Sequence, residues 1–371
     1  MLTKFSVSNF KSFNEELIFD LKDTNGYEFN KECLKDGIVN NALIYGHNGV
    51  GKSNLGLAIF DVISHLTDSI NNEPEYSNYL NALNTSKLAV FKYEFLINSV
   101  IVIYEYKKTD KREIISEKFS INNKIFAFID RTKSNDAKVE FKGTENLKTE
   151  LENKELSLLK YIKNNSVLEK NLENNAFKDF FKFIEGMLFF RSLQGNMFLG
   201  VEVEKKWLAQ DIIERGNVKD FEVFLNNAGI ECKLNVIKEF DKDVLAFDFN
   251  EKAISFFQIA SQGTKALTLF YFWLQRIRES NLVSFLFIDE FDAFYHHALS
   301  AIIVTELKKT GVQFILTSHN TSIISNDLLR PDCYFLMYKQ SISSLSNRTS
   351  KELREAHNIE KMYKAGAFNG Q

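Results

Sequence analysis

The segment Gly46–Ser53, with the sequence GHNGVGKS, limits the possible folds of this 371-residue chain more than any other feature. It matches the pattern GxxxxGK[ST], and a short apolar run, Ala42–Tyr45, lies directly before it. Behind it, apolar residues recur at steps of three and four, as on one face of a helix: Leu55, Ile59, Val62, Ile63 and Leu66. A strand, a glycine-rich loop and a helix in this order form a phosphate-binding loop, in which backbone N–H groups surround phosphate oxygens. A glycine turn that arises by chance is the alternative, but it does not explain the strand and the helix.

The residue types in this loop suit the binding of ATP with Mg²⁺. Glycine is needed where a Cβ would keep the backbone away from the phosphates. We expect Lys52 to reach the β- and γ-phosphates and the Ser53 hydroxyl to bind Mg²⁺. The predicted nucleotide-binding residues here are Gly46, His47, Asn48, Gly49, Val50, Gly51, Lys52, Ser53 and Asn54.

Two further apolar runs end in polar residues. Phe285–Ile288 leads into Asp289 and Glu290, at the carboxyl end of a predicted buried strand, where α/β sheets place their sites. We expect Asp289 to hold Mg²⁺ and Glu290 to orient or deprotonate the attacking water. Ile315–Ser318 leads into His319, a predicted catalytic sensor of the γ-phosphate. A solvated acidic turn and a structural histidine are the alternatives.

The order of predicted elements divides the chain into a split head and an insert. Residues 1–67 and 188–371 have α/β character, and residues 68–187 form the expected insert. Within the insert, residues 88–107 alternate as two strands of an antiparallel sheet, and Glu145–Phe183 is charged and leucine-spaced, which predicts a mostly helical lobe. We therefore expect an α/β P-loop NTPase head with a mixed sheet, plus an inserted antiparallel sheet and helical lobe.

Composition excludes several classes of protein. With 46 basic and 49 acidic residues the formal net charge is −3, so any contact with nucleic acid requires a local basic patch. The three cysteines, Cys33, Cys232 and Cys333, lie far apart in the sequence and predict a reducing compartment. No apolar run reaches the roughly 18 residues of a membrane helix, and the alternating N-terminus does not read as a secretion signal. We expect a cytoplasmic protein with no membrane association.

Together with Ser261–Lys265, the three elements resemble the ABC-type ATPases of the SMC, RecF and OLD group. The opening Phe5–Phe13, FSVSNFKSF, is similar to the start of that group, and Leu353–Phe368 resembles its tail, R-x-x-x-N-x-E-x-x-Y-x-x-G-x-F. More closely, the chain looks like the compact ATPase subunits of bacterial anti-phage systems of the PARIS-like and Rlo-like kinds. The resemblance implies an ABC-type head.

The resemblance also implies further site residues. Ser261 and the backbone of Gly263 would contact the γ-phosphate bound to a second subunit, although this loop departs from the common LSGGQ form. Gln194 would contact Mg²⁺ and water. Lys11 and Ser12 would touch the α-phosphate or the ribose. An N-cap loop, a surface loop and a solvated turn are the respective alternatives.

The same resemblance implies a mechanism in which ATP brings two heads together. Asp292 is a weaker candidate for the contact loop between the subunits. Each subunit would supply half of each site, so we expect a homodimer or a higher homo-oligomer. Hydrolysis would remove the bridging γ-phosphate and release the interface.

Three functions compete on this basis. The favoured one is an ATPase that controls a separate effector, a TOPRIM- or HNH-type nuclease, in anti-phage defence; we find no TOPRIM-like acidic cluster after residue 340. The second is a DNA-repair or chromosome-maintenance ATPase that binds DNA directly. It would need a long coiled coil or a basic groove, whereas the basic segments 107–112 and 204–206 are diluted by acids. The third, a transporter subunit, disagrees with the signature loop and the opening segment.

The insert and the tail are the expected partner surface, because the nucleotide chemistry is accounted for elsewhere. Residues 88–107 would offer a sheet edge to another chain. A helical face would offer Leu151, Leu156, Leu159 and Ile162. The alternative is that both elements bury their own apolar faces.

Overall fold

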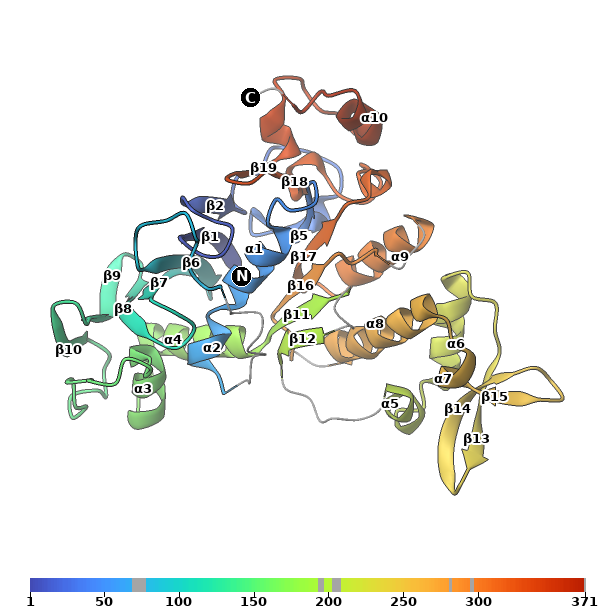
Figure 1. Cartoon of the computed structure of the whole chain (residues 1–371), viewed down its shortest axis with the longest axis horizontal. Helices are drawn as coiled ribbons and strands as arrows, with labels where there is room; N and C mark the ends of the chain where they lie inside the picture. Colours follow the sequence, from blue (N-terminus) through green and yellow to red (C-terminus); the bar gives the residue numbers. More distant parts are fainter. Residues whose placement is uncertain (69–77, 193–196, 202–207, 280–281, 294–296, 370–371) are drawn as a thin grey trace.

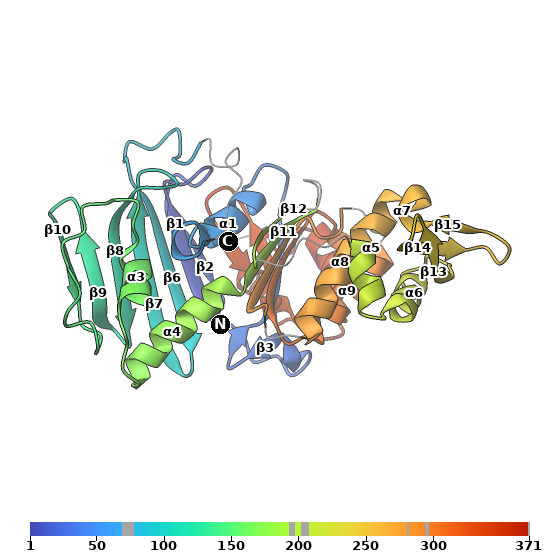
Figure 2. The same ribbon diagram turned by 90° about the horizontal axis from the view of Figure 1, so that it is seen from below.

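The structure is a computed structural model that describes residues 1–68, 78–192, 197–201, 208–279, 282–293 and 297–369. A parallel sheet occupies the middle of the molecule, with an antiparallel sheet on one side and helices α8 and α9 on the other (Figures 1 and 2). Figure 2 shows helix α1 between the two sheets. No helix in the described ranges is both long enough and apolar enough to cross a membrane.

The central sheet has seven strands in the order β12-β11-β16-β17-β5-β18-β19. Neighbours from β11 to β18 pair in parallel, whereas the outer strands β12 and β19 pair antiparallel, so the predicted mixed sheet is confirmed. The strands are β5 (Asn41–Tyr45), β11 (Met187–Arg191), β12 (Met197–Gly200), β16 (Phe285–Asp289), β17 (Gln313–Ser318), β18 (Tyr334–Met337) and β19 (Ile342–Ser344). Strands β5, β11, β16 and β17 are buried along their whole length, as predicted for the apolar run 285–288 in β16.

Ten α-helices are assigned in the described parts of the chain. They are α1 (Lys52–Phe60), α2 (Ile63–Leu66), α3 (Leu158–Asn165), α4 (Leu172–Glu185), α5 (Leu208–Glu214), α6 (Val218–Asn227), α7 (Phe256–Ile259), α8 (Gln262–Glu279), α9 (His297–Lys308) and α10 (Ile359–Lys364). Helix α1 lies very close to the central sheet, because a Cβ on Gly56 would come within 2.9 Å of the rings of Phe189 and Phe287. This close packing holds the phosphate loop, which precedes α1, against the sheet.

The antiparallel sheet also has seven strands, in the order β10-β9-β8-β7-β6-β1-β2. They are β1 (Leu2–Ser8), β2 (Leu17–Asp20), β6 (Ala89–Ile97), β7 (Val100–Lys108), β8 (Ile114–Ile121), β9 (Lys124–Asp130) and β10 (Ser134–Val139). Strand β1 pairs with β6, so the segment 68–187 shares this sheet with residues near the N-terminus. Two short strands, β3 (Leu34–Lys35) and β4 (Ile38–Val39), form a separate pair.

The expected partner surface on the insert is wrong for the two features named above. Strands β6 and β7 are both interior strands of the sheet, so neither offers an edge. On the proposed helical face, Leu159 and Ile162 are fully buried and Leu151 is nearly so. These elements therefore bury their own apolar faces.

The predicted long helical stretch over 145–183 is only partly right. Helix α3 begins after Ser157, whose side chain caps it by accepting a hydrogen bond from the backbone N–H of Lys160, and α4 begins after the equivalent cap Asn171. Residues 149–151 instead run beside β10: the N–H of Ala137 bonds the carbonyl of Thr149 at 2.9 Å. The backbone there pairs with the sheet, which removes it from the helix.

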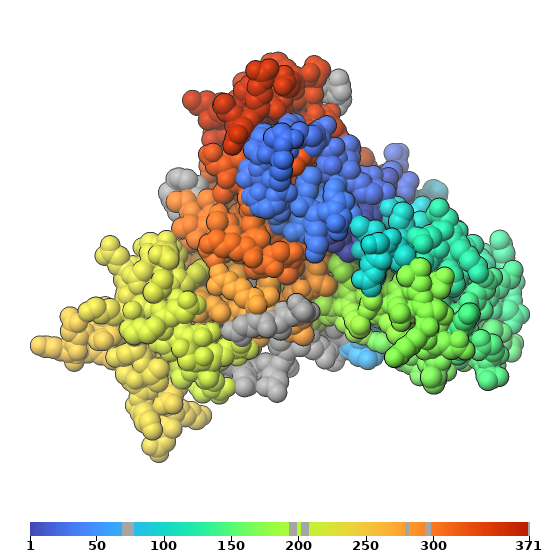
Figure 3. Space-filling model, turned by 180° about the vertical axis from the view of Figure 1, so that it is seen from behind, coloured from blue at the N-terminus to red at the C-terminus, as the bar shows by residue number. Residues whose placement is uncertain are grey.

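A small lobe projects from the molecule at the far end from the insert (Figures 1 and 3). Its sheet contains β13 (Leu234–Glu239), β14 (Lys242–Asp248) and β15 (Ala253–Ser255), and α5, α6 and α7 pack on it. Strands β13 and β14 form a hairpin whose turn lies at Phe240-Asp241. Both turn residues have positive φ, as a two-residue hairpin turn requires.

The C-terminal tail returns to the central sheet. Asn358 caps α10 by accepting a hydrogen bond from the N–H of Lys361 at 2.8 Å. The ring of Tyr363 in α10 packs edge-on against Tyr45, the last residue of β5, with centroids 5.0 Å apart. The tail therefore contacts the strand that leads directly into the phosphate loop.

Candidate functional site

Three neighbouring strands bring the predicted residues together. In the order β16-β17-β5, their carboxyl ends carry the Asp289-Glu290 pair, His319 and the phosphate loop. Parallel pairing places these three ends at the same edge of the sheet. The phosphate loop, which is more than 200 residues from the other two motifs along the chain, forms one site with them for this reason.

The phosphate loop depends on two glycines with left-handed backbone. Gly49 has φ +78° and Gly51 has φ +109°. A Cβ on Gly51 would also lie 2.7 Å from the hydroxyl of Ser12. Any other residue at position 51 would therefore be strained and would collide with the segment that packs on the loop.

Lys52 turns its ammonium group back into the loop. Its Nζ donates a hydrogen bond to the carbonyl of Gly46 at 2.7 Å, and the residue is only 5% exposed. Burial lowers the pKa of Lys52, while the nearby Glu290 and Asp289 act in the opposite direction. The two carboxylates and the ammonium thus lie within electrostatic reach of one another.

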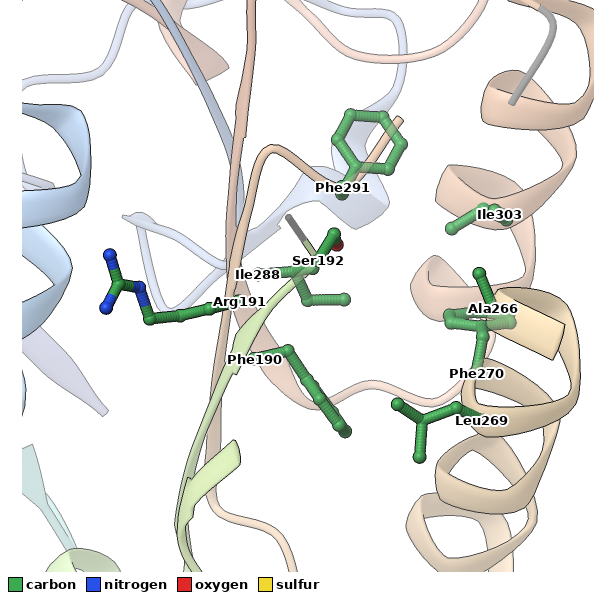
Figure 4. A pocket seen from close by; sticks show the side chains of 9 residues that line it. All are labelled: Phe190, Arg191, Ser192, Ala266, Leu269, Phe270, Ile288, Phe291 and Ile303. Atoms are coloured by element: carbon green, nitrogen blue, oxygen red, sulfur yellow. The ribbon is translucent and has the colours of Figure 1, made fainter. Parts of the chain in front are cut away.

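Asp289 and Arg191 end neighbouring strands in register, and both point toward the α1 side of the sheet. Phe190 and Ile288 point the other way, into a small apolar cavity of about 30 Å³ that α8 and α9 close. Figure 4 shows Arg191 directed away from that cavity. The Nε atom of Arg191 lies 4.0 Å from a carboxylate oxygen of Asp289. Sequence reasoning missed Arg191, although a cation that ends a buried apolar strand is a usable signal.

Thr317 on the middle strand binds both acidic residues. Its hydroxyl donates to Oδ1 of Asp289 at 2.7 Å and accepts from the backbone N–H of Glu290 at 2.8 Å. Sequence reasoning missed this residue as well. Its sequence signal is a hydroxyl that directly follows the apolar residues 314–316, two positions before His319.

His319 lies between the base candidate and the loop lysine. Its Nε2 is 3.0 Å from Oε1 of Glu290, and Nζ of Lys52 lies 3.1 Å from Nε2 and 3.2 Å from Nδ1. The ammonium of Lys52 therefore lies against the imidazole, about equally far from its two nitrogens. The histidine therefore connects the residue expected to act on water with the residue expected to hold the γ-phosphate.

Lys11 and Ser12 differ in how close they lie to the phosphate loop. Ser12 accepts a hydrogen bond from the side-chain amide of Asn54 at 2.8 Å, so Ser12 and Asn54 lie beside the loop as expected for binding residues. The backbone of Lys11 is bound at both ends by residues 79–81. The N–H of Lys11 donates to the carbonyl of Tyr79, and the carbonyl of Lys11 accepts from the side-chain amide of Asn81.

Ser261 begins the predicted signature helix. Helix α8 starts at Gln262, and the Ser261 hydroxyl caps it by accepting from the N–H of Thr264 at 3.1 Å. Ser261 is exposed, and Gly263 is half-buried in the first turn. Figures 1 and 2 place this end of α8, next to α7, on the far side of the central sheet from α1.

Two further candidates complete the set. Asp292 accepts a hydrogen bond from Ser318 at 2.7 Å, and burial raises the pKa of its carboxyl. Gln194 lies outside the described residues.

The residues present suit Mg²⁺. The Ser53 hydroxyl at the start of α1 and the buried Asp289 carboxylate at the end of β16 are oxygen donors, which this ion prefers. The fit rests on this donor chemistry and on the buried carboxylate beside Lys52.

The fold and the composition of this site define a P-loop ATPase. The chain belongs to the family described as "AAA domain, putative AbiEii toxin, Type IV TA system", whose model matches residues 42–325. This match covers all three strand ends and confirms the expected resemblance at the level of a P-loop ATPase family. No curated protein gave a significant sequence match.

Solved structures of SMC head domains are similar to this chain. The SMC head domain from Thermotoga maritima is 16% identical, with a TM-score of 0.44 over 92% of this chain and 98% of that chain. An Smc head bound to the C-terminal winged-helix domain of ScpA is 16% identical, with a TM-score of 0.47 over 93% and 97%. An Smc head with an extended coiled coil, bound to the C-terminal domain of ScpA derived from Pyrococcus furiosus, is 15% identical, with a TM-score of 0.46 over 93% and 97%.

Proposed function

We propose that this protein hydrolyses ATP and that ATP binding joins two copies, which controls a partner effector, a nuclease, in anti-phage defence. The observation that carries the first part is the contact series from Lys52 through His319 to Glu290. It places a phosphate-binding cation and a base candidate against the same histidine.

Each residue has a distinct role in the proposed hydrolysis. Lys52 holds the β- and γ-phosphates, and Glu290 accepts a proton from the attacking water. His319 keeps the Glu290 carboxylate oriented and reports whether the γ-phosphate is present. Mg²⁺, held by Ser53 and Asp289, would neutralise charge on the phosphates when bound.

The position of Ser261 supports the pairing of two copies. Its exposed hydroxyl and the start of α8 lie across the sheet from α1, so they are placed to serve a site outside their own phosphate loop. A nucleotide that contacts both copies binds the closed pair better than the single chain, and this difference in affinity drives the pairing.

The family description supports the control of another activity. A putative toxin of a toxin–antitoxin system is named there, and the sequence after residue 340 has no TOPRIM-like acidic cluster. We therefore place the nuclease activity on a separate chain.

The test measures phosphate release, mass and partner capture with one preparation. We expect Mg²⁺-dependent phosphate release from ATP, a doubled mass with ATP but not with ADP, and co-purification with the product of an adjacent nuclease gene. Lys52→Ala should lose phosphate release, and Lys124→Ala, a change of an exposed lysine, should not. Tight, salt-sensitive binding of DNA by the isolated protein, with no partner retained, would support the chromosome-maintenance reading instead.

A further inference from the structure

The hydroxyl of Thr317 occupies an unusual position for a core threonine. The residue is fully buried in β17, between the phosphate-loop strand and β16. Its Oγ1 forms two hydrogen bonds across to the end of β16: one to the Asp289 carboxylate at 2.7 Å and one from the Glu290 N–H at 2.8 Å. One hydroxyl is therefore shared between the metal-ligand candidate and the base candidate.

The backbone of Thr317 strengthens this hold. Its carbonyl accepts the N–H of Phe291 at 3.1 Å. Between these two anchors Glu290 has φ +50°, a left-handed conformation that a glutamate rarely adopts. This turn ends the strand and directs the Glu290 side chain toward His319.

We propose that Thr317 is a positioning residue that sets the orientation of Asp289 and Glu290 together. Hydroxyl donation fixes which oxygen of Asp289 remains for a metal ion, and acceptance of the Glu290 N–H fixes the turn that aims the base. This inference rests on the proposed hydrolysis for its kinetic readout, but the geometry it describes is independent of turnover.

Replacing Thr317 by valine tests the hydrogen bonds of the hydroxyl separately from the packing of the side chain. Valine has nearly the same shape and keeps the contacts of β17, but it removes the acceptor of the Glu290 N–H and the hydroxyl that donates to Asp289. Thr317→Ser keeps both hydrogen bonds and loses only a methyl group. Thr144→Val is the matched control, because Thr144 is a buried threonine of the insert whose hydroxyl bonds only the Phe141 carbonyl, at 2.6 Å.

The kinetic test compares the three variants with the wild type. Thr317→Val should lower kcat by about tenfold or more while KM for ATP stays within about twofold, since the loss falls on the reacting groups. Thr317→Ser and Thr144→Val should stay close to the wild-type kcat. A Thr317→Val enzyme with wild-type kcat overturns the proposal, and so does an equal loss of kcat in Thr317→Ser and Thr317→Val, which indicates packing alone.

Two further measurements do not depend on turnover. Calorimetry of ATP binding with Mg²⁺ and with EDTA should show a smaller gain from Mg²⁺ in Thr317→Val than in the wild type. Hydrogen exchange over residues 289–291 should be faster in that variant and unchanged in Thr144→Val. A wild type that binds ATP without hydrolysing it contradicts the proposed function only; unchanged Mg²⁺ dependence and unchanged exchange in Thr317→Val contradict the role of Thr317.

Discussion

His319 holds the carboxylate of Glu290 through a 3.0 Å hydrogen bond between Nε2 and Oε1. The same imidazole contacts the Lys52 ammonium, which lies 3.1 Å from Nε2 and 3.2 Å from Nδ1, so the base candidate and the phosphate-loop lysine meet at one histidine within a single chain. A change at any one of these three residues should therefore affect the other two.

Glu290→Gln should retain ATP binding and lose turnover by at least about a hundredfold, because an amide keeps the shape of the side chain but cannot accept the proton. The persistent ATP state should appear as a larger assembly in light scattering with ATP and Mg²⁺. A variant that hydrolyses ATP at the wild-type rate would show that the base lies elsewhere, and His319 is then the next candidate.

Lys52→Ala should weaken ATP binding by at least about tenfold, since it removes the buried cation that faces the β- and γ-phosphates. Isothermal titration calorimetry measures this directly, with Lys124→Ala as the control for loss of a positive charge. Unchanged affinity would remove Lys52 from the binding site.

Two inactive variants should restore activity when mixed, if the sites are shared between copies. Lys52→Ala and Ser261→Arg each damage both sites of their own homodimer. In the mixed dimer, one site carries both changes and the other carries none. Mass spectrometry should show that mixed dimers form. If they form and phosphate release is still absent at every mixing ratio, the model in which one intact shared site suffices for hydrolysis is contradicted.

Asp61→Asn should destabilise the protein by about 3–5 kcal/mol, because it leaves a buried ammonium without its counter-charge. Asp61 follows α1, and its carboxylate pairs at 2.9 Å with Lys108 of β7; both side chains are inaccessible to solvent. The midpoint of urea unfolding measures the change. The double variant Asp61→Asn/Lys108→Met should recover much of the lost stability, and a double variant as unstable as the single one would point to the tyrosine partners of Asp61 instead.

Acidification should destabilise the fold through His65. Burial, with a smaller contribution from Lys108, lowers the pKa of this histidine well below its usual value of 6.5. Below pH 6.5 the unfolded chain therefore binds a proton that the folded chain does not, so the free energy of unfolding falls as the pH decreases, by at most about 1.4 kcal/mol per pH unit.

Urea unfolding of the wild type and of His65→Gln from about pH 7.5 to about pH 5.5 isolates this effect, because glutamine does not titrate in that range. The wild type should lose more stability than the variant over the interval. Parallel curves would show that His65 protonates equally well in the folded state.

Local patterns in the sequence determined the chemistry of the site and the class of the fold. The phosphate loop, the buried strand at 285–288 and the histidine after the strand at 315–318 were predicted from the sequence, and both segments lie in strands of the central sheet. This works because a glycine-rich loop, an unbroken apolar run and a polar residue at a strand end each depend on a few adjacent residues.

Tertiary structure alone decided which residues meet. Pairing of β17 between β16 and β5 brings Thr317 and His319 to the two acids, and pairing of β1 with β6 joins the insert to the N-terminus. Residues 149–151 run beside β10 instead of continuing a helix. In each case the outcome depends on backbone hydrogen bonds to segments far away in the sequence. The spacing of residues within one segment does not determine which distant segment its backbone pairs with.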